Sequence, residues 1–111
     1  MMATTQAYVV FVCDQIKGVG EVRFKKMFGE YLVYVNDKSV LAVCDNTVYV
    51  KMVPEIEAKM LQAKIGYPYS NAKAHYILEI DKADFSKEIV AILEAVTPVS
   101  KTSRKRKKLG V

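Results

Sequence analysis

The sequence predicts an α+β fold, one antiparallel sheet packed with helices, in the order α-β-β-β-α-β-α. Three observations predict it: helical spacing of apolar residues near the N-terminus, period-two alternation from Val22 onward, and two tight-turn signals between short apolar runs. With 111 residues, 51% of them hydrophobic, the chain has enough apolar material for one core. We expect one domain over residues 1–98 and a flexible basic tail over residues 99–111.

Residues 5–17 are expected to form the first helix. Threonines that can cap a helix precede it, and Gly18 ends it. Its apolar residues recur at helical spacing, and they are Tyr8, Val9, Val12, Cys13 and Ile16. The run Y-V-V-F-V is also rich in β-branched residues, so a strand is the alternative for this segment.

Three strands are expected next, at residues 31–35, 40–44 and 48–52. Asn36-Asp37 and Asp45-Asn46 separate them, and these residue types tolerate the positive φ of two-residue hairpin turns. With two such loops Leu32 lies opposite Leu41, and the predicted core face comprises Leu32, Tyr34, Leu41, Val43, Val48, Val50 and Met52.

The opposite face of these strands is predicted to be apolar as well. It carries Tyr31, Val33, Val35, Val40, Ala42, Cys44 and Tyr49. A solvated face would be polar, so a helix, a second subunit or a ligand is expected to cover it. Self-association is the favoured external cover, which predicts a homodimer interface at Tyr31, Val33, Val40, Ala42 and Tyr49. The rival interpretation is a small-molecule pocket lined by the same face.

The second half of the chain is expected to hold two helices and one strand. A helix starts at Pro54, has acidic residues in its first turn and ends at Gly66. A strand at residues 75–80 follows. Ser86 is expected to cap the last helix, which carries Ile89, Ile92, Leu93 and Val96 and ends before Pro98.

The cationic residues fall into two groups. The net charge of +5 comes from residues 101–111, because the rest of the chain holds eleven cations against twelve acids. In this tail a run of five cations can contact phosphates of nucleic acid through counterion release, or it can simply solubilise a disordered end. The run is Arg104, Lys105, Arg106, Lys107 and Lys108.

The second group interleaves with aromatic residues in R-F-K-K-M-F-G-E-Y at 23–31. In an extended chain Val22, Phe24 and Lys26 share one face. Arg23, Lys25 and Lys26 are the candidate nucleic-acid contacts here, as in proteins that bind single strands. The favoured interpretation is that these cations protect a sheet edge from pairing with another molecule.

No residue pattern predicts catalysis, a cofactor or a metal site. Cys13, Cys44 and the single histidine, His75, lack a metal-ligand or nucleophile spacing, and buried thiols are expected. No apolar run is long enough for a bilayer, and no signal-like core is present, so a cytoplasmic protein is expected. The residues favour an interaction module over an enzyme.

Three segments resemble the TfoX N-terminal domain family, found in bacterial competence regulators and in small stand-alone proteins. They are G-V-G-E-V-R-F-K-K-M-F-G-E-Y at 18–31, C-D-N-T-V-Y-V-K at 44–51 and Y-P-Y-S-N-A-K-A-H-Y at 67–76. The resemblance covers roughly residues 5–97. It implies an α+β regulatory or binding module of the cytoplasm without catalytic residues, and it supports a helix at residues 5–17. Leu32 replaces a glycine frequent in the family, and no second, C-terminal domain is expected, so a direct role in activating competence genes is not expected.

Overall fold

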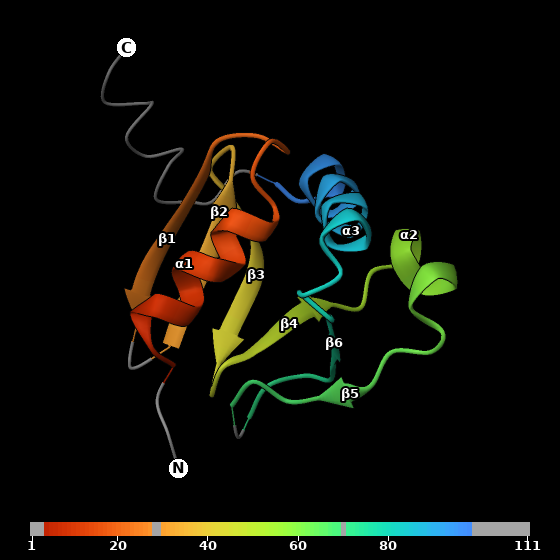
Figure 1. Cartoon of the computed structure of the whole chain (residues 1–111). Helices are drawn as coiled ribbons and strands as arrows, with labels where there is room; N and C mark the ends of the chain where they lie inside the picture. Colours follow the sequence, from red (N-terminus) through yellow and green to blue (C-terminus); the bar gives the residue numbers. More distant parts are fainter. Residues whose placement is uncertain (1–3, 28–29, 70, 99–111) are drawn as a thin grey trace.

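The computed structural model of the chain describes residues 4–27, 30–69 and 71–98. It confirms the α+β class, with a six-stranded antiparallel sheet in the order β1-β2-β3-β4-β6-β5 (Figure 1). The strands are β1 (Val22–Met27), β2 (Glu30–Val35), β3 (Lys38–Cys44), β4 (Thr47–Lys51), β5 (Ile65–Gly66) and β6 (His75–Ile77). The helices are α1 (Gln6–Gln15), α2 (Pro54–Glu57) and α3 (Ala83–Val96), with the 3₁₀ helix η1 (Ala58–Met60) directly after α2.

Helix α1 forms where the spacing predicted it, and the strand alternative was wrong. Thr5 caps it, since its hydroxyl accepts a hydrogen bond from the Tyr8 N–H at 3.2 Å. Gly18 follows with a φ of 101°, a conformation that glycine adopts without strain. Val9, Val12 and Ile16 are fully buried. Packing of this apolar side therefore outweighs the β propensity of its valines.

Both predicted hairpin turns are present. Asn36 and Asp37 have φ values of 52° and 66°, and Asp45 and Asn46 have 51° and 52°. Two consecutive positive φ values define the type I′ turn, whose twist matches that of the flanking strands. The second hairpin has the predicted register, with Val43 opposite Val48.

The first hairpin contains a β-bulge that changes its register. Tyr34 pairs with Ser39 next to the turn, but Val33 pairs with Leu41, so Val40 is an extra residue on β3. Side chains alternate along a strand, and one extra residue therefore exchanges the faces of β2 relative to the far part of β3. The prediction that Leu32 and Tyr34 point into the core was wrong for this reason.

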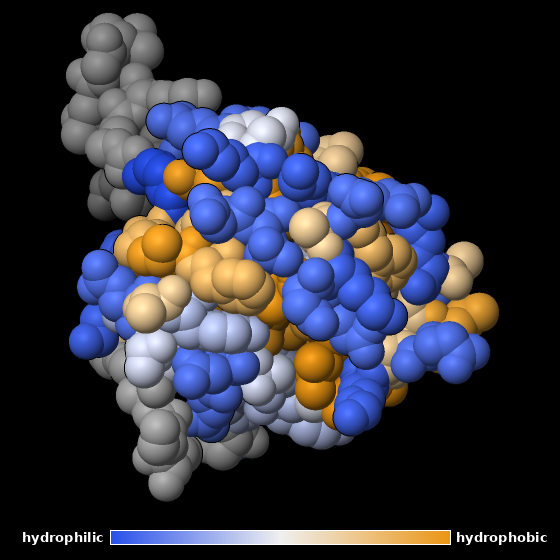
Figure 2. Space-filling view, in the orientation of Figure 1, coloured by the Kyte–Doolittle hydropathy of each residue, from blue (hydrophilic) through white to orange (hydrophobic). Residues whose placement is uncertain are grey.

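The core lies between the sheet and a single layer of helices. The strands contribute Tyr31, Val33, Val35, Leu41, Val43, Val48 and Val50, and the helical segments contribute Val9, Val12, Ile16, Ile56, Met60, Ile89, Val90 and Leu93. Helix α1 packs on β1, α3 packs on β3, and the two helices touch each other, so they share one side (Figure 1). Seen from the side of α1, the surface is largely polar with separate apolar patches (Figure 2). Met52, predicted to be in the core, follows β4 and is 39% exposed.

The second half of the chain departs from the predicted elements in three places. Strand β5 begins at Ile65, where the predicted helix was expected to end, and pairs with β6. Strand β6 is shorter than predicted. Helix α3 begins at Ala83, so Ser86 lies inside it, is buried, and donates its hydroxyl to the Glu79 carbonyl at 3.3 Å. The prediction of Ser86 as the helix cap was therefore wrong.

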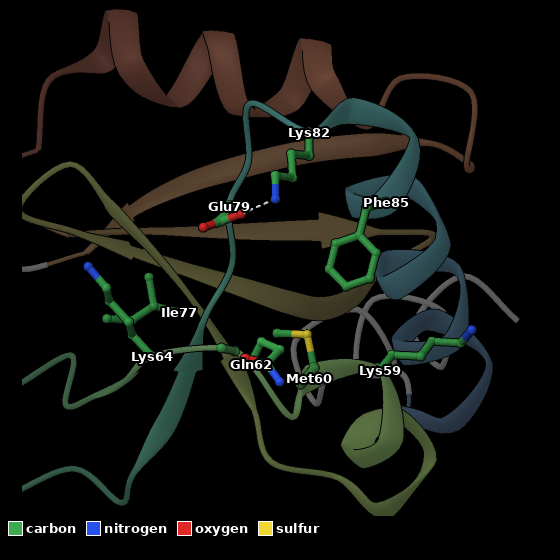
Figure 3. Close-up of a pocket in the computed structure, with 9 residues that line it drawn as sticks. Lys59, Met60, Gln62, Lys64, Ile77, Glu79, Lys82 and Phe85 are labelled. Carbon is green, nitrogen blue, oxygen red and sulfur yellow. Dashed lines mark ion pairs between the residues drawn. The ribbon is translucent and has the colours of Figure 1, made fainter.

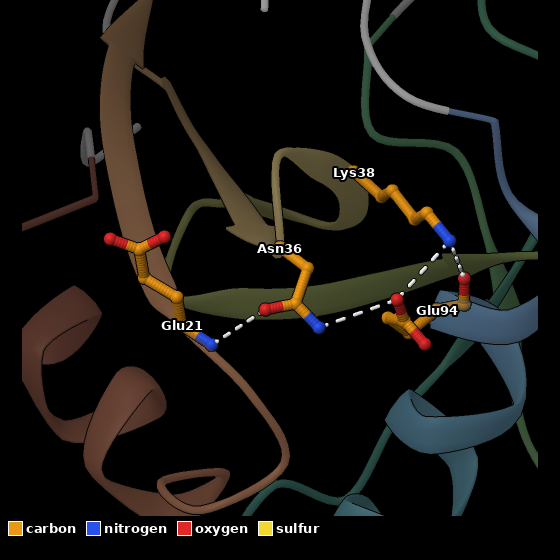
Figure 4. Close-up of polar contacts among 4 residues, drawn as sticks. All are labelled: Glu21, Asn36, Lys38 and Glu94. Atoms are coloured by element: carbon orange, nitrogen blue, oxygen red, sulfur yellow. Dashed lines mark hydrogen bonds and ion pairs between the residues drawn. The ribbon is translucent and has the colours of Figure 1, made fainter.

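Polar contacts fasten the first hairpin to α3 (Figure 4). The Asn36 amide accepts a hydrogen bond from the Glu21 N–H at 2.9 Å and donates one to the Glu94 carboxylate at 3.3 Å. Lys38 donates to the Glu94 carbonyl at 2.9 Å and pairs with its carboxylate at 3.1 Å. Hydrogen bonds from Lys38 and then Asn36 lower the pKa of Glu94.

Candidate interaction surface

The sheet face opposite the helices carries a row of apolar side chains. Directly paired residues share a face of a sheet, and the pairs Leu32–Ala42, Ala42–Tyr49 and Tyr49–Ile77 connect four neighbouring strands. We call these four residues, Leu32, Ala42, Tyr49 and Ile77, the apolar row. Each is partly exposed, and no helix of the described residues packs over them. The row is thus available to a partner.

One flank of the apolar row is cationic and aromatic. Arg23 pairs with Tyr34 across β1 and β2, and Lys51 pairs with His75 across β4 and β6. The Arg23 guanidinium carbon lies 5.8 Å from the centre of the Tyr34 ring, and its nitrogen forms an ion pair with Asp37. This flank therefore combines flat rings with positive charge.

The other flank carries an acid. Glu30 begins β2 on the same face as Leu32 and lies next to Cys44 of β3. Burial, followed by the charge and hydrogen bond of Glu30, raises the pKa of the Cys44 thiol to about 12. Thr47 of β4 is paired with Cys44. The two flanks of the row thus differ in charge.

The Tyr49 ring packs closely against the backbone of Gly66 in β5. A Cβ atom on Gly66 would lie 3.0 Å from Cε1 of Tyr49, so the glycine leaves room for the ring against β5. The His75 ring stands perpendicular to the Tyr49 ring, with 6.4 Å between their centres. Burial, and then the charges of Cys44 and Asp45, raise the pKa of Tyr49.

The five residues predicted to form a dimer or ligand face do not share one face. Ala42 and Tyr49 belong to the apolar row, whereas Tyr31 and Val33 lie in the core with 4% and 0% exposure. Val40 sits in the bulge and is also buried. Because of the bulge, β2 presents its other side to the open face.

Two members of the apolar row were not predicted as site residues. Leu32 was assigned to the core through the assumed register, and no residue type near Val40 marks the bulge. Ile77 joins the row only because β6 pairs with β4, although α2, η1 and β5 lie between them in the chain. Apolar character alone does not reveal such a pairing.

The predicted cations are divided among different places. Arg23 and Lys25 point to the open face, and Lys26 lies on the helical side, paired with Tyr31. β1 is the first strand of the sheet and pairs only with β2, which agrees with the expected edge protection. The basic run Arg104–Lys108 lies outside the described residues.

Metal-ligating residues do not cluster. No group of three or more histidine, cysteine or carboxylate side chains that could hold a metal occurs in the described ranges. Cys44 is buried, Cys13 is half-buried, and both are free thiols. His75 Nδ1 lies 2.7 Å from the Lys73 carbonyl, a local structural contact. No helix in the described part of the chain is long and apolar enough to cross a membrane.

A six-stranded antiparallel sheet with helices on one face and an apolar row on the other defines a small α+β domain with an open sheet face. The profile of the TfoX N-terminal domain matches residues 14–87, and the chain belongs to this family. The chain is also 31% identical over 109 residues to an uncharacterized 12.7 kDa protein in the trpE 5′ region of Spirochaeta aurantia. The matched residues make up 96% of this chain and 95% of that protein. The family resemblance predicted from the three sequence segments is thus confirmed.

Proposed function

We propose that this chain is a non-enzymatic, cytoplasmic regulatory module of the TfoX N-terminal type that forms a homodimer through the apolar row. The observation that supports the proposal is the continuous row across four strands, on the sheet face over which no helix of residues 4–27, 30–69 and 71–98 packs. Burying Leu32, Tyr49 and Ile77 against a second copy removes apolar surface from water. If the two-fold axis runs along the row, each of these residues lies near its own symmetry mate.

The charges beside the row favour one arrangement of the two copies. A two-fold axis parallel to the row turns the cationic flank of one copy toward the Glu30 flank of the other. Arg23 of each copy then approaches Glu30 of the other on both sides of the axis, at the end of the row where β1 and β2 lie. The perpendicular axis would bring like flanks together, which is electrostatically worse.

Light scattering after gel filtration tests the homodimer. At tens of micromolar the full chain is expected to have twice its mass of 12.5 kDa. Ala42→Glu places a charge in the centre of the row and should yield the single-chain mass. Val10→Glu is the matched control, because Val10 is 49% exposed on the helical side. A single-chain mass for the unmodified protein, or a dimer that survives Ala42→Glu, would contradict the proposal.

We further propose that the cations at 104–108 provide affinity for nucleic acid. Five adjacent cations can displace condensed counterions from a phosphate backbone, which gives binding without sequence preference. Arg23 and Lys25 contribute less, since an ion pair to Asp37 offsets the charge of Arg23.

Fluorescence anisotropy with labelled mixed-sequence DNA separates these two groups of cations. In the full chain, replacing all five tail cations by glutamine should abolish binding at low salt. Replacing Arg23, Lys25 and Lys26 by glutamine should leave most of the binding and its salt dependence. The proposal fails if the tail variant binds DNA with an unchanged salt slope.

A further inference from the structure

A cavity lies at the β6 end of the sheet. It has a volume of about 500 Å³ and lies between the segment after η1, the C-terminal end of β6 and the first turn of α3 (Figure 3). Small-molecule sites commonly occupy several hundred cubic ångströms between elements in this way. Its lining residues are Lys59, Met60, Gln62, Ala63, Lys64, Ile77, Glu79, Lys82 and Phe85.

The lining combines apolar surface with an excess of positive charge. Met60, Ala63 and Phe85 supply carbon and sulfur surface, and Met60 is only 3% exposed. Three lysines and one glutamate supply the charge. A ligand that balances this lining therefore has an apolar body and a negative group.

Two of the three lysines already have carboxylate partners. Lys82 pairs with Glu79 at 2.7 Å, and Lys59 pairs with Glu88 at 2.5 Å. Within the described residues Lys64 has no ion pair. Its charge nevertheless reaches the cavity, because Lys64 contributes to the lowered pKa of Glu79 after the larger effect of Lys82. Lys64 is thus the cation available to a bound anion.

The Lys82–Glu79 pair can rearrange at small cost. Both side chains are about two-thirds exposed, at 66% and 64%, and exposed pairs contribute little to stability. Lys82 can therefore turn from Glu79 toward a ligand, or bridge both. Figure 3 shows this pair at the rim of the cavity, with Phe85 and Met60 facing the space from α3 and η1.

We propose that this cavity binds a small organic acid, with its carboxylate held by Lys64 and Lys82 and its apolar body packed on Met60 and Phe85. Inorganic phosphate fits less well, since it covers none of the apolar lining and brings more negative charge near Glu79. A neutral molecule of the same shape leaves the ammonium of Lys64 without a counter-charge. The site shares Ile77 with the apolar row, but none of the four residues proposed to hold the acid belongs to that row or to the basic run at 104–108.

Titration with 3-phenylpropionate tests the site, observed through the ¹³C-labelled methionine methyl groups of the full chain. The Met60 signal is expected to shift with saturation, while the signal of Met52 stays in place. 3-Phenylpropanol, which lacks the charge, and inorganic phosphate, which lacks the apolar body, should each bind at least tenfold more weakly. If the alcohol binds as tightly as 3-phenylpropionate, the cavity selects only apolar surface. If phosphate binds as tightly, the cavity selects only negative charge. Either result overturns the proposal.

Two variants locate the binding within the cavity. Lys64→Gln should weaken 3-phenylpropionate about tenfold, and Lys73→Gln, which removes the same charge from an exposed position outside the lining, should leave it unchanged. Ala63→Leu fills the apolar part without changing the charge and should also weaken binding. Circular dichroism confirms folding of each variant. The proposal fails if Lys64→Gln and Lys73→Gln bind the acid equally.

Discussion

Because of the β-bulge at Val40, we expect alanine substitutions at two adjacent residues of β2 to differ strongly in their effect on stability. Val33 is fully buried and paired with Leu41, whereas Leu32 is partly exposed in the apolar row. We expect Val33→Ala to destabilise the protein strongly and Leu32→Ala to do so weakly. A hairpin without the bulge would reverse this order, because Leu32 would then occupy the core.

The expected free energies follow from burial. Val33→Ala removes two buried carbon groups at about 0.8 kcal/mol each and leaves a small cavity, so the loss is about 2–3 kcal/mol. Leu32→Ala removes more carbon from a site that water already reaches, and its cost should stay below about 1 kcal/mol. At about 4–8 °C per kcal/mol, the Val33→Ala variant should melt about 8–24 °C lower.

Urea unfolding followed by circular dichroism measures both variants. Both variants are measured at low and at high micromolar protein concentration. Dimer formation stabilises the folded state more at high concentration, and Leu32→Ala should weaken the dimer whereas Val33→Ala should not. If the m-value is unchanged, a shift of the urea midpoint reports a change in the free energy of unfolding. A larger loss for Leu32→Ala at the lower concentration would refute the bulged register.

Three further predictions concern the polar framework and the buried thiol. Gly20→Ala places a Cβ 2.7 Å from the Asn36 amide nitrogen and should cost about 1–3 kcal/mol in urea unfolding; a neutral effect would contradict the close packing. The raised pKa of Cys44, about 12 against an ordinary 9.0, means that the folded state keeps a proton that the unfolded state loses. Stability should therefore fall as pH rises above about 9, and less so in Cys44→Ala; parallel pH profiles would refute this. The lowered pKa of Glu94 has the opposite sign, so its contribution is present above its ordinary pKa of 4.5 and disappears as pH falls through the lowered value. Glu94→Gln should flatten the acid limb of the stability profile, and the same limb in both proteins would exclude a role for its contacts with Lys38.

Local signals in the sequence were sufficient for much of the fold. Thr5 and Gly18 marked α1 because capping and positive φ depend on few neighbouring residues. Asn36-Asp37 marked its hairpin for the same reason. The α+β class followed from these elements.

Features that depend on distant contacts were not predictable in this way. Val40 is an ordinary β-branched strand residue, and only the packing of both strands against the helices decides that it becomes the extra residue. The sequence predicted Ser86 as a helix cap, but its hydroxyl instead donates a hydrogen bond to the carbonyl of Glu79, which precedes the helix. The bulge decides which residues of β2 lie on the open face, so three of the five residues of the predicted interface are buried.

The order of the strands has a consequence for synthesis on the ribosome. Strands β1 to β4 are neighbours in both sequence and space, so their hairpins can pair once Lys51 has emerged. Helix α1 is then already available for its side of the sheet, but α3, which packs on β3, comes last. During this interval β3 lacks the cover that α3 provides. Nascent chains halted before Ala83 should therefore be the species that chaperones bind and that aggregate most readily.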